Sequence, residues 1–153
     1  MSEIAEHVPG YDKDFVVSFQ DVLSGKVTVS GSAVVIGGDR TGIETARYLA
    51  ARGVLVTILE RLPEIATDLD ASCRLRLGED MRKEGILPVT GVTVTEIRGG
   101  IDNSTAAGAA DEEFYDYGSS GKRGRKAYRE VIGEKDGITI GFPCNYAVMA
   151  AGS

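Results

Sequence analysis

The sequence has no tryptophan, one histidine, two cysteines and four prolines, and aromatic residues make up only 7% of it. The single histidine, His7, lies in a polar N-terminal segment, and we assign it no catalytic role. Cys73 and Cys144 form no C-x-x-C pair, so neither a zinc site nor a redox dithiol is predicted. We expect two buried free thiols in a reducing compartment, and we predict no catalytic or metal-ligating set.

Long hydrophobic runs and a basic charge balance are also missing. No apolar stretch approaches the ~20 residues that a membrane-spanning helix needs, and the N-terminus lacks the apolar region of a signal peptide. The net charge of -6 argues against nucleic acid or an anionic membrane as a partner. With 42% hydrophobic residues in 153, the chain can form one domain with a real core, which we expect to be cytoplasmic.

Apolar runs and helical spacing alternate along the chain in the order expected of an α/β domain. Buried parallel strands are predicted at 33–36, 54–59, 86–89 and 146–151, with helices between the first three. Ser18 or Asp21 is expected to cap a short helix, and Asp68 or Asp70 a longer one. Residues 93–97 form a further predicted strand, and 128–140 a hairpin that turns at Asp136-Gly137.

The predicted fold is a Rossmann-like three-layer α/β domain with a central parallel sheet and an antiparallel β-meander or hairpin layer. Residues 1–12 are expected to be a tether, within a linker and short helix that cover 1–31, and 32–153 form the domain proper. Periodicity disappears over 98–126, a stretch longer than ordinary loops, and we interpret it as a mobile insertion or as a segment ordered by something absent from this chain.

A glycine-rich turn joins the first confident strand to a helix, and it is the strongest functional signal in the sequence. The turn is Gly37-Gly38-Asp39-Arg40-Thr41-Gly42, close to the dinucleotide fingerprint G-x-G-x-x-G. Such a turn brings backbone N–H groups at a helix N-terminus near a pyrophosphate. Gly37 and Gly42 supply the tight turn and the close contact between helix and strand. Glu60, at the end of the next strand, is where a carboxylate would bind both hydroxyls of the adenosine ribose.

Asp39 occupies the position where the fingerprint has its second glycine. A carboxylate ~5 Å from a phosphate is opposed by about 3 kcal/mol at an effective dielectric constant near 20, which would weaken binding by about two decades. Arg40 could neutralise Asp39 or hold the phosphate. Alternatively, Asp39 could accept the helix N–H groups itself. Thr41 and Glu44 also fit a capping box.

Two further residues bear on the choice of nucleotide. Arg61 follows Glu60 and could face the 2'-phosphate of NADP, but a solvated arginine is the preferred interpretation. Because the carboxylate of Glu60 suits free ribose hydroxyls, NAD(H) is predicted over NADP(H).

With these residues identified, the chain resembles the NAD(P)H-binding domain of the pyridine nucleotide-disulfide oxidoreductase superfamily. Within that superfamily it is most similar to bacterial NADH:flavin oxidoreductases of the 2,4-dienoyl-CoA reductase and old yellow enzyme type. The resemblance covers roughly 8–97 and 136–153. It is carried by these segments: Pro9-Gly10, Asp21-Val22-Leu23, Gly25-Lys26, Val34 to Glu44, Glu60, Leu62-Pro63-Glu64, Gly91, Val94 to Ile97, and Ala150 to Ser153.

The resemblance implies that this chain is an excised piece of a larger flavoenzyme, whose FAD-binding and flavin-barrel domains would be its partners. FAD would belong to the parent enzyme and not to this fragment, which is not expected to turn over alone. The resemblance assigns Gly37, Gly38, Gly42 and Glu60 to the nucleotide, and Glu44 to the nicotinamide side near the flavin. Together with the residues discussed above, the predicted cofactor-binding set is Gly37, Gly38, Asp39, Arg40, Gly42, Glu44, Glu60, Arg61 and Gly152.

Three functions remain open at this stage. The first is an NAD(H)-binding module that positions the nicotinamide for hydride transfer to FAD in the parent enzyme. The second is a structural or interaction domain of the same ancestry, in which Asp39 blocks the phosphate site. The third, an FAD-binding domain, is disfavoured because Gly42-Ile43-Glu44 resembles the NAD-side form of the motif. The sequence also leaves open whether the chain forms a homo-oligomer.

Overall fold

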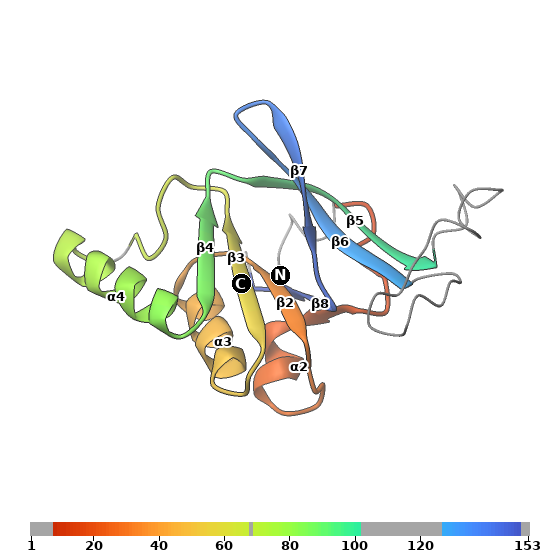
Figure 1. The fold of residues 1–153 in the computed structure, drawn as a ribbon, viewed down its shortest axis with the longest axis horizontal. Coiled ribbons are helices and arrows are strands. Elements are labelled where there is room, and N and C mark those ends of the chain that lie inside the picture. Colours follow the sequence, from red (N-terminus) through yellow and green to blue (C-terminus); the bar gives the residue numbers. More distant parts are fainter. Residues whose placement is uncertain (1–7, 68, 102–126, 151–153) are drawn as a thin grey trace, which may run out of the picture.

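The computed structural model describes residues 8–67, 69–101 and 127–150, which form two β-sheets and three helices (Figure 1). Among these residues no helix is both long and apolar enough to cross a membrane. The elements follow one another as β1 (Val16–Ser18), α2 (Phe19–Leu23), β2 (Ser32–Ile36), α3 (Arg40–Ala50), β3 (Leu55–Glu60), α4 (Ala71–Lys83), β4 (Ile86–Thr90), β5 (Thr93–Ile101), β6 (Ala127–Lys135), β7 (Ile138–Pro143) and β8 (Tyr146–Met149).

The larger sheet is parallel, and its strand order is β1-β8-β2-β3-β4. The last strand of the chain therefore lies in the sheet between the first two. Ile36 of β2 pairs with Leu59 of β3 on one side and with Met149 of β8 on the other. Because the three strands are parallel and in this register, their carboxyl ends meet at one edge of the sheet.

The parallel sheet is the middle one of three layers. On one face, α2 and α3 cover residues such as Val35 and Ile58, which belong to the helix-side core. On the other face, the antiparallel sheet β5-β6-β7 packs over Val34, Ile36 and Leu59. Successive residues of β2 thus enter opposite cores, as the continuous apolar run predicts. The predicted fold class is confirmed.

The predicted helix caps are found at the amino ends of two helices. Ser18 caps α2 by accepting a hydrogen bond from the N–H of Asp21 (3.1 Å), and Asp70 caps α4 by accepting one from the N–H of Cys73 (2.9 Å). Asp21 lies within α2 and is not its cap, and Asp68 lies outside the described residues. In both cases the cap lies three residues before the amide that it satisfies, which is the usual geometry.

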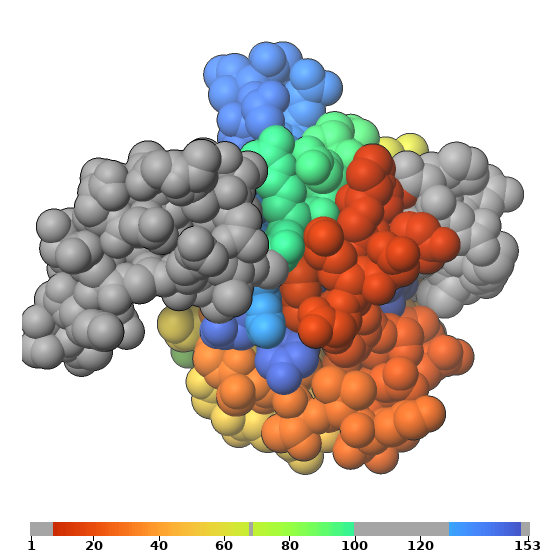
Figure 2. All heavy atoms as spheres, turned by 90° about the vertical axis from the view of Figure 1, so that its right-hand side faces the viewer, coloured from red at the N-terminus to blue at the C-terminus, as the bar shows by residue number. Residues whose placement is uncertain are grey.

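The predicted hairpin joins β6 and β7 through a two-residue turn. Asp136 and Gly137 have φ angles of 54° and 80°, as a type I' turn requires. The pairing of Lys135 with Ile138 closes the turn. The tip of this hairpin projects beyond the rest of the molecule in Figures 1 and 2.

The N-terminal segment differs from the expected tether. Val8 and Phe15 are buried in the core between the two sheets, and the carbonyl oxygen of Pro9 accepts a hydrogen bond from the N–H of Ile97 (2.8 Å). Figure 2 shows this segment, in red, lying against β5, in green. The tether prediction is therefore wrong from Val8 onward, because long-range packing orders a segment that is locally polar. The division into 1–31 and 32–153 stays a prediction.

Strand β5 continues to Ile101, beyond the predicted end at Ile97, so the first residues of the predicted insertion belong to the antiparallel sheet. Gly99 permits this extension because a Cβ there would lie 2.1 Å from Cε1 of Phe15. The rest of the predicted insertion, residues 102–126, lies outside the described residues. One thiol also differs from expectation: Cys144 is buried, but Cys73 is exposed on α4.

Candidate nucleotide-binding site

The candidate site lies where β2, β3 and β8 end together. The N–H of Gly37, directly after β2, donates to the carbonyl oxygen of Leu59 (2.8 Å). The N–H of Ala150, directly after β8, donates to the carbonyl oxygen of Ile36 (3.1 Å). Loops that follow the carboxyl ends of neighbouring parallel strands are where open α/β sheets bind ligands. The backbone thus places the glycine turn and Glu60 in the same region.

The glycine turn has the steric features predicted for its first and last glycines. Gly37 has a φ of 120°, a conformation that residues with a side chain rarely adopt. At Gly42, a Cβ would lie 1.8 Å from the carbonyl oxygen of Gly37. Helix α3 therefore approaches the end of β2 more closely than any residue other than glycine would allow.

Glu60 is bound to the glycine turn by a contact that the sequence did not predict. Its Oε1 accepts a hydrogen bond from the N–H of Gly38 (2.7 Å), and its Oε2 accepts one from the N–H of Leu62 (2.7 Å). Hydrogen bonds from amides to a carboxylate are short and strong, so these two fix the orientation of the half-buried side chain. The carboxylate is held at the carboxyl end of β3 and faces the turn.

Asp39 is the N-cap of α3. Its backbone is extended (φ -87°, ψ -170°), and its Oδ1 accepts a hydrogen bond from the N–H of Gly42 (3.1 Å). Of the roles considered for Asp39, the structure shows the one in which its own carboxylate accepts a helix N–H group. The side chain remains exposed, so water can screen its charge.

The predicted capping box of Thr41 and Glu44 is wrong. Helix α3 begins at Arg40, so Thr41 lies within its first turn, and the hydroxyl of Thr45 donates to the carbonyl oxygen of Thr41 (2.8 Å). Asp39 is at least as good an N-cap as threonine and lies two positions earlier. Once it caps the helix, Thr41 has helical geometry and cannot serve as the cap.

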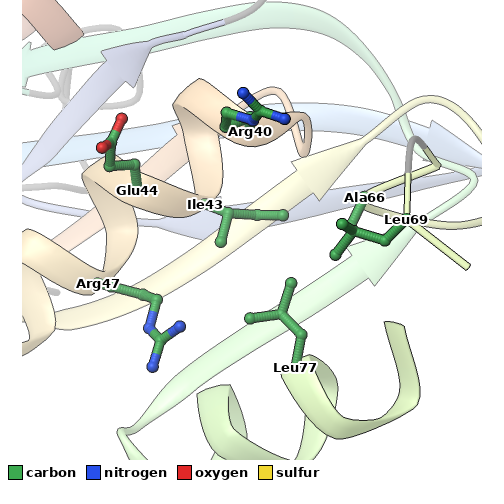
Figure 3. Close-up of a pocket in the computed structure, with 7 residues that line it drawn as sticks. All are labelled: Arg40, Ile43, Glu44, Arg47, Ala66, Leu69 and Leu77. Carbon is green, nitrogen blue, oxygen red and sulfur yellow. The ribbon is translucent and has the colours of Figure 1, made fainter. Parts of the chain in front are cut away.

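Arg40 and Glu44 line a cavity of about 290 Å³ between α3, α4 and the loop that precedes α4 (Figure 3). In Figure 3, Ile43 and Leu77 point into this space, while Arg40 and Glu44 lie along one side of it. Arg47 also lines the cavity, and two hydrogen bonds with Glu84 (2.9 and 2.6 Å) raise its pKa. The structure therefore places Arg40 and Glu44 together on α3, beside a cavity that Glu60 does not line.

Two predicted residues remain to be located, Arg61 and Gly152. Arg61 is exposed, directly after β3, and Gly152 lies outside the described residues. Within the described part of the chain, no group of histidine, cysteine, aspartate and glutamate residues could hold a metal ion. The nucleotide-binding role of all the predicted residues stays a prediction.

Ala66 is part of the candidate site and was missed by the sequence interpretation. It is buried, it has a φ of 52°, and its N–H donates to the carbonyl oxygen of Gly38 (3.0 Å). An alanine with positive φ carries backbone strain that surrounding contacts must compensate. No sequence pattern marks such a residue, because its conformation depends on the fold around it.

Comparison with known proteins relates the chain to oxidoreductases. Residues 32–107 match the family model described as pyridine nucleotide-disulphide oxidoreductase. The chain is 42% identical over 98 residues to an NADH oxidase from Thermoanaerobacter brockii, in an alignment that covers 61% of this chain and 15% of that protein. It is 32% identical over 132 residues to a bilirubin reductase from Mediterraneibacter gnavus, with 86% and 16% covered.

Among solved structures, that of a 2-naphthoyl-CoA reductase in complex with 2-naphthoyl-CoA is similar to this chain. The TM-score is 0.68 at 27% sequence identity, and the match covers 95% of this chain and 18% of that one. This chain thus spans less than a fifth of the length of each of these three proteins.

Proposed function

Because the chain carries a domain of the pyridine nucleotide-disulphide oxidoreductase superfamily, we propose that it binds NAD(H) where β2, β3 and β8 end. In this proposal the domain works within a longer flavin-dependent NADH oxidoreductase. The single observation that carries the proposal is the carboxylate of Glu60, which two backbone amides hold beside the glycine turn.

The residues present fit the adenosine end of a dinucleotide. The carboxylate of Glu60 retains acceptor capacity beyond its two amide bonds, since each oxygen offers more than one lone pair. Its oxygens would accept hydrogen bonds from ribose hydroxyls, and its negative charge would repel a 2'-phosphate. This charge is the reason to propose NAD(H) over NADP(H), and the exposed Arg61 is proposed to remain in solvent.

We propose that three glycines of the turn let the phosphates approach it, namely Gly37, Gly38 and Gly42. The positive charge of Arg40 would attract the phosphates. Glu44, farther along α3, is proposed to lie on the nicotinamide side, and Gly152 to follow β8 into the site. The nucleotide would supply a hydride when bound. The acceptor would be the FAD of the parent enzyme, held by its other domains.

The domain type can be proposed more finely. We propose that the parent enzyme is an NADH:flavin oxidoreductase of the 2,4-dienoyl-CoA reductase type, as the resemblance in the sequence implies. The FAD-binding and flavin-barrel domains of such an enzyme would then be the partners of this domain. Residues 32–153 are proposed as the nucleotide-binding unit.

Calorimetric titration of the chain with NADH and with NADPH tests the proposal. We expect saturable NADH binding, and we expect Glu60→Gln to weaken it by about tenfold or more, since hydrogen bonds to charged groups are worth ~1.5 to 3 kcal/mol. The substitution keeps the shape of the side chain but removes its charge, so the preference for NADH over NADPH should shrink.

The matched control is Glu79→Gln, which makes the same change at an exposed position on α4 and should leave both affinities unchanged. The unfolding temperature of each variant shows whether it is folded. Absence of saturable NADH binding at millimolar concentration would contradict the proposal. Wild-type affinity in Glu60→Gln would remove Glu60 from the site.

One observation favours a second candidate, a structural or partner-binding domain of the same ancestry. Asp39 uses its carboxylate to accept the N–H of Gly42, a donor that a bound phosphate would otherwise use. If this cap cannot open, the turn would be closed to phosphates. The response of NADH affinity to a substitution at Asp39 distinguishes the two candidates.

A further inference from the structure

The loop between β3 and α4 lies directly against the glycine turn. We define this covering loop as residues 61–67 together with Leu69. Its Ala66 is hydrogen-bonded to Gly38, and Ile65 packs so closely on Gly38 that a Cβ there would lie 2.8 Å from Cγ2 of Ile65. The covering loop therefore supports the same glycine whose N–H binds Glu60.

Backbone hydrogen bonds attach the covering loop to one further segment and close the loop on itself. The carbonyl oxygen of Leu62 accepts a bond from the N–H of Gly91 (2.9 Å), in the turn between β4 and β5. The N–H of Leu69 donates to the carbonyl oxygen of Ala66 (3.0 Å). None of these bonds requires a particular side chain, so the sequence does not reveal them.

Arg74 on α4 adds a side-chain attachment that holds the loop at two places. One of its terminal nitrogens donates to the carbonyl oxygen of Leu69 (2.6 Å), and the other forms an ion pair with Oε1 of Glu64 (3.0 Å). A guanidinium group is planar and presents several donors in fixed directions, so it can hold two acceptors at once. The side chain is 26% exposed, which limits the competition from water.

We infer that Arg74 is a positioning residue for the adenosine end of the candidate site. It holds the covering loop against Gly38 and thereby fixes the amides that orient the carboxylate of Glu60. The inference rests on the proposed function, because the ligand that benefits is the adenosine part of NAD(H). Prior ordering of a binding loop lowers the entropic cost of binding, so loss of this brace should weaken affinity.

The test combines amide hydrogen exchange with calorimetric titration of ADP-ribose, using the full chain and Arg74→Met. We expect exchange at Ala66 to accelerate at least tenfold, because its N–H is buried only while the loop is held. ADP-ribose should bind about five- to tenfold more weakly. Glu64→Gln, which removes only the ion pair, should give smaller changes in the same direction.

Arg76→Met is the matched control, since Arg76 lies on the same helix and is exposed. It removes the same charge and should change neither measurement. Unaltered exchange at Ala66 in Arg74→Met would show that Arg74 does not hold the covering loop in place. Faster exchange with unchanged ADP-ribose affinity, relative to Arg76→Met, would overturn the positioning role. If wild-type protein binds no ADP-ribose, the proposed function fails and the positioning role with it, while the exchange data still decide whether Arg74 braces the loop.

Discussion

The two sides of the glycine turn satisfy their backbone amides with carboxylates of different origin. On the strand side, the N–H of Gly38 binds Glu60, a residue from the end of the neighbouring strand. On the helix side, the N–H of Gly42 binds Asp39, a residue of the turn itself. The first contact links two segments far apart in the chain, whereas the second stays within four residues.

This difference indicates how each side would respond to a ligand. In the proposed site, Glu60 would keep both amide bonds and still accept hydrogen bonds from a ribose, so its contacts would prepare the site. The carboxylate of Asp39 accepts a hydrogen bond from the N–H of Gly42, a donor that a bound phosphate would need. This contact would therefore compete with the phosphate. Under the proposed function, the strand side would therefore be preorganised, and the helix side would exchange the carboxylate of Asp39 for a phosphate.

The largest expected effect comes from Gly42→Ala. This variant tests the close approach of α3 to the end of β2, on which both sides of the turn depend. The new Cβ would lie 1.8 Å from the backbone oxygen of Gly37, and backbone atoms cannot move aside cheaply. We expect the free energy of unfolding to fall by about 3 kcal/mol or more, at the upper end of overpacking effects. Denaturant unfolding followed by circular dichroism measures this loss.

Gly78→Ala provides the control for that experiment. Gly78 lies within α4, and a Cβ there would meet nothing within 4 Å. Because alanine is favoured over glycine inside a helix, this variant should gain roughly 0.5 to 1 kcal/mol. Equal stability of the two alanine variants would show that α3 and β2 are farther apart than the structure has them.

Asp39→Gly should have the next largest effect, on binding more than on stability. Removing the carboxylate frees the N–H of Gly42 and removes the charge that opposes a phosphate. We expect NADH to bind at least tenfold more tightly in calorimetric titration, while glycine at an N-cap costs only a few tenths of a kcal/mol relative to aspartate. Weak wild-type binding that tightens in this way would support the nucleotide-binding proposal.

Asp70→Gly is the matched control, because Asp70 caps α4 with the same geometry, accepting from the N–H of Cys73. It should alter stability slightly and leave NADH affinity unchanged. Equal NADH affinity in wild type and Asp39→Gly would remove the electrostatic argument. No binding in either protein would favour the structural or partner-binding candidate.

The same contrast explains how much of the molecule the sequence could predict. The β2-α3-β3 unit and the Asp136-Gly137 hairpin follow from local signals of a few residues, whereas Ser18 and Asp70 were each one of two cap candidates that the sequence left open. The steric roles of the fingerprint glycines were equally accessible. All of these features depend on residues close together in the chain, where spacing and conformational preference decide the structure.

Features that depend on distant segments were missed. Burial of Val8 and Phe15 requires β5, and the bonds of Glu60 to Gly38 and of Ala66 to Gly38 require the folded sheet. Asp39 shows a different limit, because two capping patterns overlapped within one turn and the sequence alone could not rank them. Tertiary contacts decide the burial of Val8 and Phe15 and the bonds to Gly38, and no local pattern encodes them.

The smallest expected effect is that of Arg47→Met, which tests whether the part of the cavity that Arg47 lines contributes to the site. Arg47 lines this cavity and forms an ion pair with Glu84, in which both side chains are partly exposed, at 42% and 35%. Exposed ion pairs contribute only ~0 to 1 kcal/mol, so the free energy of unfolding should fall by no more than that.

NADH affinity should stay within about twofold of wild type in Arg47→Met, because Glu60 and Asp39 make none of their hydrogen bonds with Arg47. Arg47→Met and Glu84→Gln should give similar stabilities, and the double variant should be no less stable than the sum of the single changes predicts. A large loss of NADH affinity in Arg47→Met would extend the proposed site from Arg40 and Glu44 along α3 to Arg47.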